Sequence, residues 1–235
     1  MWNNWRKYIQ PGIAASICLL CNQRGGFKYD ICPSCERELP WNRHACRRCA
    51  TPLPAGSDDR VCGHCLRHPP VWDQARSPLL YGWPLDQLIQ RFKFHSDLTT
   101  GHLLGSLLAN FLAADPGPRP ALLIPVPLHT SRIRERGFNQ AVELARPVAG
   151  RLRIPLALHV CRRVRPTDVQ SRLDHKARLR NMRGAFEVTA GVAGRDVAVL
   201  DDVVTTGATV AALAGCLHAA GAARIRVWSL ARAVH

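Results

Sequence analysis

Two adjacent carboxylates, Asp201 and Asp202, stand where an apolar run meets a turn rich in hydroxyl groups and glycine. The four apolar residues 197–200 are typical of a parallel strand buried on both faces. Residues 208–220 have the composition of a helix, and Gly221 is placed to end it. The turn therefore lies at a helix N-terminus, where unpaired N–H groups and the positive end of the helix dipole favour phosphate. Carboxylates beside it can accept hydrogen bonds from the vicinal hydroxyls of a ribose or hold a hydrated Mg²⁺.

The alternative for the acid pair is a simple helix cap, a common role for Asp. Like charges repel at contact distance, so two adjacent acids after an apolar strand are poorly placed for a plain turn. We therefore expect a sugar-phosphate site in which Gly207 lets the backbone approach the ligand closely. The predicted binding residues are Asp201, Asp202, Val203, Val204, Thr205, Thr206, Gly207, Ala208 and Thr209.

Eight of the ten cysteines form four pairs with two residues between the partners. Eight thiolates at this spacing suffice for two tetrahedral zinc sites with four cysteines each. A disulfide framework is the alternative, and the absence of a recognisable secretory signal argues against it. Spacing alone leaves sequential and interleaved pairing of the ligands both open. The predicted zinc ligands are Cys18, Cys21, Cys32, Cys35, Cys46, Cys49, Cys62 and Cys65.

The chain has 235 residues, of which 47% are apolar, enough for one core and a small metal-held module. We expect residues 1–70 to form an N-terminal segment with a double zinc ribbon, and residues 71–235 to form an α/β ligand-binding domain. Zinc would supply the folding free energy of the ribbon. No apolar run reaches the ~18 residues of a spanning helix, and the start is too polar for a signal peptide. These features predict a cytoplasmic protein.

The basic residues are concentrated. The formal net charge is +15, and residues 119–183 hold 15 basic residues against four acids. Such a field attracts a phosphorylated sugar or a nucleic-acid backbone. Residues 122–128 read as a strand, and the loop expected after it carries Arg132, Arg134 and Arg136, whose planar guanidinium groups suit pyrophosphate. Residues 165–183 are predicted to form a flap over the ligand.

Together these motifs resemble a family. The stretch 201–209 resembles the phosphoribosyl pyrophosphate (PRPP) motif of type I phosphoribosyltransferases. With the four cysteine pairs and residues 91–94, 125–128, 134–140 and 180–186, the chain from Cys18 onward resembles the ComF-type family, the competence-associated ComF and gluconate-associated GntX group. The resemblance implies an α/β, type I phosphoribosyltransferase fold, a central and mostly parallel sheet flanked by helices, preceded by a small double zinc ribbon.

The resemblance also implies roles for individual residues. The acid pair would hold the ribose, residues 205–209 the 5′-phosphate, and Mg²⁺ would bind with PRPP. Pyrophosphate would lie against Pro127, Leu128, Arg132, Arg134 and Arg136. No catalytic role is assigned, and the candidates are Asp201, Asp202, Lys93 and Arg136. Purine-salvage relatives carry a carboxylate where this chain has Thr205, so hypoxanthine-guanine salvage is not expected.

Three functional hypotheses follow. The first is a PRPP- and Mg²⁺-binding protein that acts in DNA uptake during natural transformation and binds single-stranded DNA. The second is an active phosphoribosyltransferase that displaces pyrophosphate with an unidentified nitrogen nucleophile. The third is a zinc-ribbon adaptor that docks a DNA-uptake helicase or translocase. Stacking of bases is open to the aromatic residues Trp72, Tyr81, Trp83, Phe92 and Phe94.

Overall fold

The computed structural model describes residues 16–25, 29–56, 60–166, 184–189 and 191–234. The first ribbon contains β1 (Ser16–Ile17), β2 (Arg24–Gly25) and α1 (Pro33–Glu38), and the second contains α2 (Gly63–Arg67). The α/β part contains β3 (Gln74–Arg76), β4 (Leu79–Leu80), α3 (Leu85–Phe94), α4 (Leu98–Ala113), β5 (Leu122–Pro125), α5 (Thr130–Arg136), α6 (Gln140–Leu152), β6 (Cys161–Arg163), β7 (Phe186–Val188), β8 (Asp196–Val204), α8 (Ala208–Ala219) and β9 (Arg224–Arg232).

The central sheet is parallel, with strand order β3-β9-β8-β5 and β4 also paired with β9. At its centre Val199 of β8 pairs with Ile124 of β5 on one side and with Val227 of β9 on the other. The apolar residues 197–200 are fully buried, as the sequence predicts. However, β8 runs on to Val204, so both aspartates belong to the strand.

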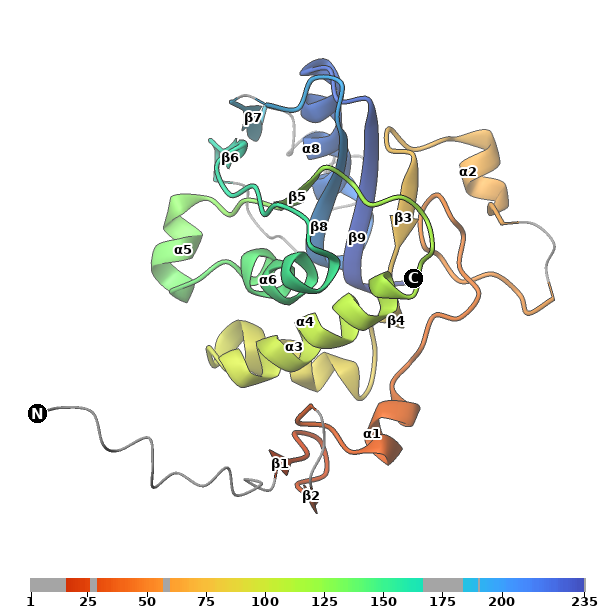
Figure 1. The fold of residues 1–235 in the computed structure, drawn as a ribbon, viewed down its shortest axis with the longest axis vertical. Coiled ribbons are helices and arrows are strands. Elements are labelled where there is room, and N and C mark those ends of the chain that lie inside the picture. Colours follow the sequence, from red (N-terminus) through yellow and green to blue (C-terminus); the bar gives the residue numbers. More distant parts are fainter. Residues whose placement is uncertain (1–15, 26–28, 57–59, 167–183, 190, 235) are drawn as a thin grey trace, which may run out of the picture.

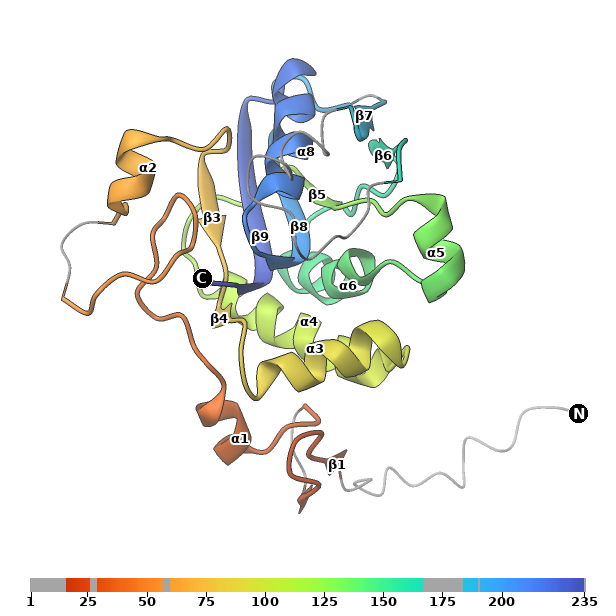
Figure 2. The same cartoon turned by 180° about the vertical axis from the view of Figure 1, so that it is seen from behind.

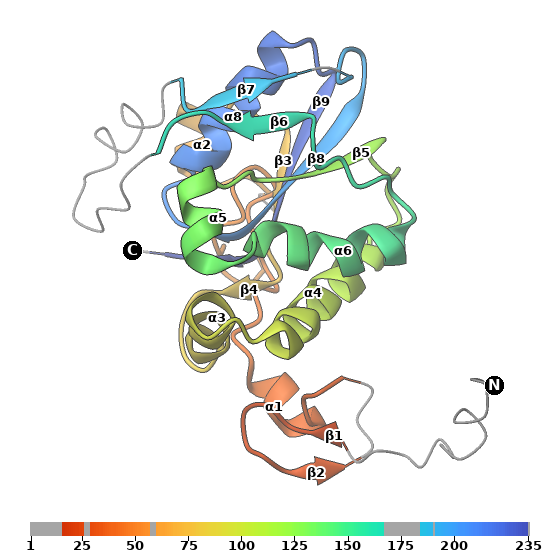
Figure 3. The same ribbon diagram turned by 90° about the vertical axis from the view of Figure 1, so that its left-hand side faces the viewer.

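Helices cover both faces of the sheet. Helix α8 lies on one face, while α4 and α6 lie on the other (Figures 1 and 2). The antiparallel pair β6 and β7 packs beside α8 (Figure 3). The predicted helix after the acid pair is confirmed, and Gly221 follows its end in the left-handed conformation at φ +84°. None of the described helices is long and apolar enough to cross a membrane.

The two ribbons lie apart, against different sides of the α/β part (Figures 1 and 3). Arg91 of α3 donates to the carbonyl of Leu19 in the first ribbon at 2.8 Å. The amide of Ala75 in β3 donates to the carbonyl of Arg47 in the second ribbon, also at 2.8 Å. The predicted fold class, a parallel α/β sheet preceded by two zinc ribbons, is confirmed. The boundary near residue 70 stays a prediction.

Two local predictions need correction, and a third falls mostly outside the described residues. The strand predicted over residues 122–128 ends at Pro125, because β5 pairs with β8 only as far as Leu200. The arginine-bearing loop is instead the helix α5, which ends at Gly137 with φ +81°. Of the predicted flap, residues 167–183 lie outside the described residues.

Candidate functional site

The acid pair occupies the carboxyl-terminal half of β8. Neighbouring strand residues point to opposite faces, so Asp201 and Asp202 face different surroundings. The Oδ2 atom of Asp202 lies 2.6 Å from Nζ of Lys93, and only 21% of the lysine side chain and 16% of the aspartate side chain are exposed. Helix α3 thus brings Lys93, one of the candidate catalytic residues, to the acid pair. The ion pair leaves Asp202 with a partner of opposite charge.

Asp201 has a less favourable environment. Burial raises its pKa, and the neighbouring charge of Asp202 raises it further, to about 7. The charges of Lys93 and Arg163 act in the opposite direction without cancelling the rise. Near neutral pH this carboxyl group is therefore divided between its two protonation states. A carboxyl group with a shifted pKa near the carboxyl end of a central strand indicates a candidate ligand site.

Arg163, at the end of β6, is a site residue that sequence reasoning missed. Its guanidinium carbon lies 5.5 Å from the centre of the Phe186 ring. Burial lowers the pKa of Arg163, while the charge of Asp201 raises it. No motif surrounds this arginine, and only the pairing of β6 with β7 beside α8 brings it near the acid pair.

The turn of residues 205–209, hereafter the 205–209 turn, leads directly into α8. Gly207 is the N-cap of the helix, has φ +81°, and provides no side-chain cap. A Cβ atom at this position would lie 3.2 Å from Cη2 of Trp72, so both backbone conformation and space favour glycine. The hydroxyl of Thr206 accepts from the amide of Ala208 only at 3.4 Å. The first turn of α8 thus offers N–H groups to an anion.

The predicted pyrophosphate-binding arginines follow β5. Because α5 is helical, Arg132 and Arg136 are four residues apart and share a face, while Arg134 lies on another side. Arg136 donates to Oε1 of Gln140 at 2.9 Å and lies 5.7 Å from the ring of Phe94, the neighbour of Lys93 in α3. Arg136 and Lys93 are thereby brought to the same region. Binding of pyrophosphate by these arginines, Pro127 and Leu128 stays a prediction.

The five aromatic residues considered for base stacking divide into two groups. Trp72 and Phe92 belong to the core, with 8% and 1% exposed. Tyr81, Trp83 and Phe94 are exposed by 40%, 69% and 70%. Only the second group is available to a macromolecular ligand.

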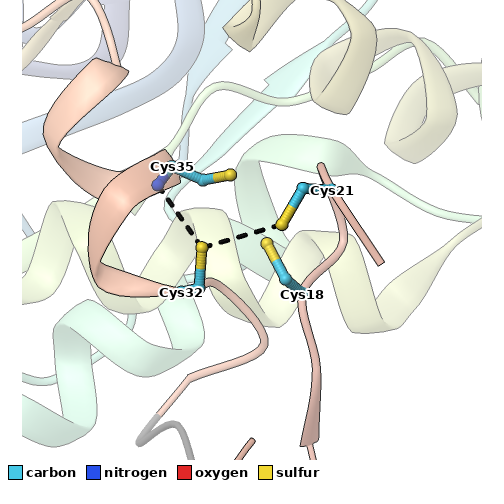
Figure 4. Close-up of side chains that lie close together, drawn as sticks. All are labelled: Cys18, Cys21, Cys32 and Cys35. Carbon is cyan, nitrogen blue, oxygen red and sulfur yellow. Dashed lines mark hydrogen bonds between the residues drawn. The ribbon is translucent and has the colours of Figure 1, made fainter. Parts of the chain in front are cut away.

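The cysteines gather in two clusters, one from the first four ligands and one from the last four, so the pairing is sequential. In each cluster the four Sγ atoms lie within 4.8 Å of one another, and Figure 4 shows the first four converging on a common centre. Thiolates ~2.3 Å from a tetrahedral zinc ion lie about 3.8 Å apart. The Cys21–Cys32 and Cys49–Cys62 Sγ separations are both 3.7 Å. Both clusters therefore fit zinc.

A parallel sheet covered by helices, an acid pair before a glycine turn, and two four-cysteine centres define a zinc-ribbon protein with an α/β domain. Residues 13–66 match the family model "Double zinc ribbon domain". DNA utilization protein YhgH of Salmonella typhi is 36% identical, with 92% of this chain and 96% of that protein covered. Competence protein F of Haemophilus influenzae is 34% identical over the same shares. The chain belongs to the ComF family of competence and DNA utilization proteins.

A more distant likeness is found among solved structures. Glutamine PRPP amidotransferase from Bacillus subtilis is 19% identical, with a TM-score of 0.40, and covers 56% of this chain and 26% of its own.

Proposed function

We propose that this protein binds PRPP with Mg²⁺ at the carboxyl edge of its sheet and acts in DNA uptake or utilization. The observation that carries the proposal is the position of Asp201 and Asp202 in β8, followed within a few residues by the uncapped N-terminus of α8. Two carboxylates repel a bare phosphate but accept hydrogen bonds from vicinal hydroxyls. The helix N-terminus, by contrast, attracts phosphate through its N–H groups and the positive end of the helix dipole. A ligand with a diol and a phosphate on one sugar meets both requirements.

Each group of residues then has a role. Asp201 and Asp202 take the ribose hydroxyls and hold the hydrated Mg²⁺, and the 205–209 turn takes the 5′-phosphate. Arg132 and Arg136 provide positive charge for the pyrophosphate from the end of β5. Bound Mg²⁺ supplies neutralisation of the pyrophosphate charge.

The role in DNA uptake or utilization is supported by the names of the relatives, which are competence and DNA utilization proteins. Binding of single-stranded DNA is supported by the exposed rings of Trp83 and Phe94 at the two ends of α3 and by Arg136 beside Phe94. Aromatic rings next to positive charge bind unpaired bases through stacking and the backbone through charge.

The test is calorimetric titration of zinc-loaded protein with PRPP in the presence of Mg²⁺. We expect binding by the wild type and none by the Asp201→Asn, Asp202→Asn double variant, with circular dichroism showing that both are folded. Asp86→Asn removes a half-buried carboxylate in the first turn of α3 and is expected to bind as the wild type does. A wild type that does not bind PRPP contradicts the proposal. Undiminished affinity in the double variant contradicts the ribose assignment.

One observation favours catalysis as a second candidate. Lys93 and Arg136 lie in one region, and Arg132 shares a helix face with Arg136, so a departing pyrophosphate would meet positive charge. In this reaction a nitrogen nucleophile bonds to the anomeric carbon of the ribose as the bond to pyrophosphate breaks. Release of pyrophosphate from PRPP with ammonia or free bases as acceptors tests it, with Arg136→Met expected to lower the rate.

A further inference from the structure

Trp72 joins the second zinc centre, defined by Cys46, Cys49, Cys62 and Cys65, to the 205–209 turn. Its indole Nε1–H donates to the carbonyl of Arg48 at 2.6 Å, inside the knuckle between the first two ligands. The far edge of the same indole packs at Gly207, where its Cη2 atom leaves 3.2 Å to a Cβ position. The side chain is 8% exposed and its ring is rigid, so Trp72 is in contact with both the knuckle and the turn.

Arg232 makes a second connection from the end of β9. It lies opposite Val204 in the ladder, and its Nη1 donates to the carbonyls of Val204, at 2.9 Å, and of Thr205, the first residue of the turn. Burial lowers the pKa of Arg232, whereas the charges of Cys49, Cys65 and Cys62 raise it. The guanidinium thus contacts the start of the turn and also interacts with the charge of the thiols. Its Nε is buried and has no hydrogen-bond partner among the described residues.

Zinc strengthens both connections. Four thiolates around one Zn²⁺ carry a net charge of about −2, which attracts the guanidinium. The metal also supplies the folding free energy of the knuckle that presents the Arg48 carbonyl. Without zinc, the knuckle loses this constraint.

The first zinc centre has a different neighbourhood. Leu19 and Tyr29 of the first ribbon contact α3 and α4, through Arg91 at 2.8 Å and Asn110 at 3.1 Å. Within the described part of the chain, neither it nor these neighbours share a hydrogen bond with the 205–209 turn. The first zinc centre therefore serves as a control for the effect of the second centre on the turn.

We infer that the second zinc centre, acting through Trp72 and Arg232, holds the 205–209 turn in its ligand-binding conformation, whereas the first centre does not. Trp72 and Arg232 are positioning residues for the turn. The inference rests on the proposed function only for the identity of the ligand, because the coupling between zinc and turn exists before any ligand binds.

Removing one ligand from each centre separates the two roles. Cys62→Ser affects the second centre and Cys21→Ser the first, and neither thiol belongs to the apolar core. We expect amide hydrogen exchange in residues 205–209 to be about tenfold faster in Cys62→Ser than in the wild type, and unchanged in Cys21→Ser. Zinc content and circular dichroism establish that each variant is folded with one centre loaded. Equal exchange in the two variants overturns the inference.

Two variants test the connections while all eight cysteines stay in place. Trp72→Phe keeps a ring near Gly207 but removes the N–H to Arg48, and Arg232→Gln removes the charge beside the thiols. We expect each to speed exchange in the turn and to weaken PRPP binding about tenfold at full zinc content. Arg232→Lys, which keeps a charge and a donor, is expected to restore part of the affinity. Slow exchange in both Trp72→Phe and Arg232→Gln overturns the inference even if Cys62→Ser does not fold.

The effect of PRPP on zinc retention is a second test. It would not change if Trp72 and Arg232 only stabilised the fold. If zinc at the second centre favours ligand binding, the ligand must favour zinc there by the same factor. PRPP with Mg²⁺ should therefore strengthen retention of one of the two zinc ions against a chelator, and this effect should vanish in Arg232→Gln. PRPP that binds without changing zinc retention refutes the coupling. A wild type that does not bind PRPP refutes the proposed function, while the exchange experiment still decides the inference.

Discussion

Replacing Asp201 by asparagine is expected to stabilise the unliganded protein at pH 8 while weakening PRPP binding. Burial, followed by the charge of Asp202, raises the pKa of Asp201 from its ordinary 3.8 to about 7. A raised acid pKa means that the folded state retains a proton that the unfolded chain has lost. The free energy of unfolding of the wild type therefore falls as pH rises from about 4 to about 7. Asparagine has the same shape and no charge, so the free energy of unfolding of the variant lacks this fall with pH.

The magnitude follows from the linkage slope. Each pH unit within that range costs the wild type up to about 1.4 kcal/mol, so the interval from pH 5.5 to pH 7 amounts to about 2 kcal/mol. Asp201 keeps some contact with water, and we expect about half of this value. The gain in unfolding free energy from Asp201→Asn should then be about 1 kcal/mol larger at pH 8 than at pH 5.5.

Urea denaturation of zinc-loaded wild type and variant at both pH values measures the difference. Taking variant against wild type at each pH cancels the pH dependence of the zinc sites. Asp97→Asn is the matched control, because hydrogen bonds from Thr100 and the charge of Arg91 outweigh burial and lower the pKa of Asp97. Its contribution is lost only below about pH 4, so its effect should be equal at pH 5.5 and pH 8. A gain from Asp201→Asn that does not grow with pH refutes the reasoning.

Four further outcomes are expected. PRPP affinity in calorimetry should rise with pH through about 7 as Asp201 ionises, beyond the change due to PRPP itself, and Asp201→Asn should remove that rise. Gly207→Ala should lower the unfolding free energy by about 1–2 kcal/mol in denaturation, because φ is +81° and Trp72 is close; Gly215→Ala, with open space, should not. Elemental analysis should find two zinc ions per chain. DNA binding, measured by fluorescence anisotropy, should fall steeply with salt and weaken in Trp83→Ala, an exposed ring.

The elements around the acid pair could be predicted because their patterns are local. The apolar run 197–200, the helix from Ala208 and the terminating Gly221 are each recognisable in a few residues, and all three are confirmed. The cysteine spacing likewise predicted two zinc centres. It left their pairing open, because sequential and interleaved pairing use the same spacing and differ in which cysteine pairs the folded chain brings around one ion.

Other features could not be predicted because they depend on distant contacts. The arginine segment has too few apolar residues to show a helical period, and its conformation as α5 is visible only in the structure. Arg163 and Arg232 lie 38 and 31 residues from Asp201 along the chain on opposite sides, in strands without a motif. Their proximity to the site results from strand pairing: β6 with β7, and β9 with β8.

The two carboxylates of the acid pair differ in their hydrogen-bond and charged partners. Asp202 already has Lys93 at 2.6 Å, and its Oδ1 accepts from the amide of Val203 at 2.6 Å. Asp201 accepts one backbone hydrogen bond, from Asp202 at 2.9 Å, and its pKa is still raised to about 7. A hydrated cation or the hydroxyl groups of a sugar would favour the ionised form of Asp201 and offset the cost of ionising this buried carboxyl group. Stability alone would favour asparagine at this position, so the presence of a carboxylate supports the proposed role of Asp201 in ligand binding.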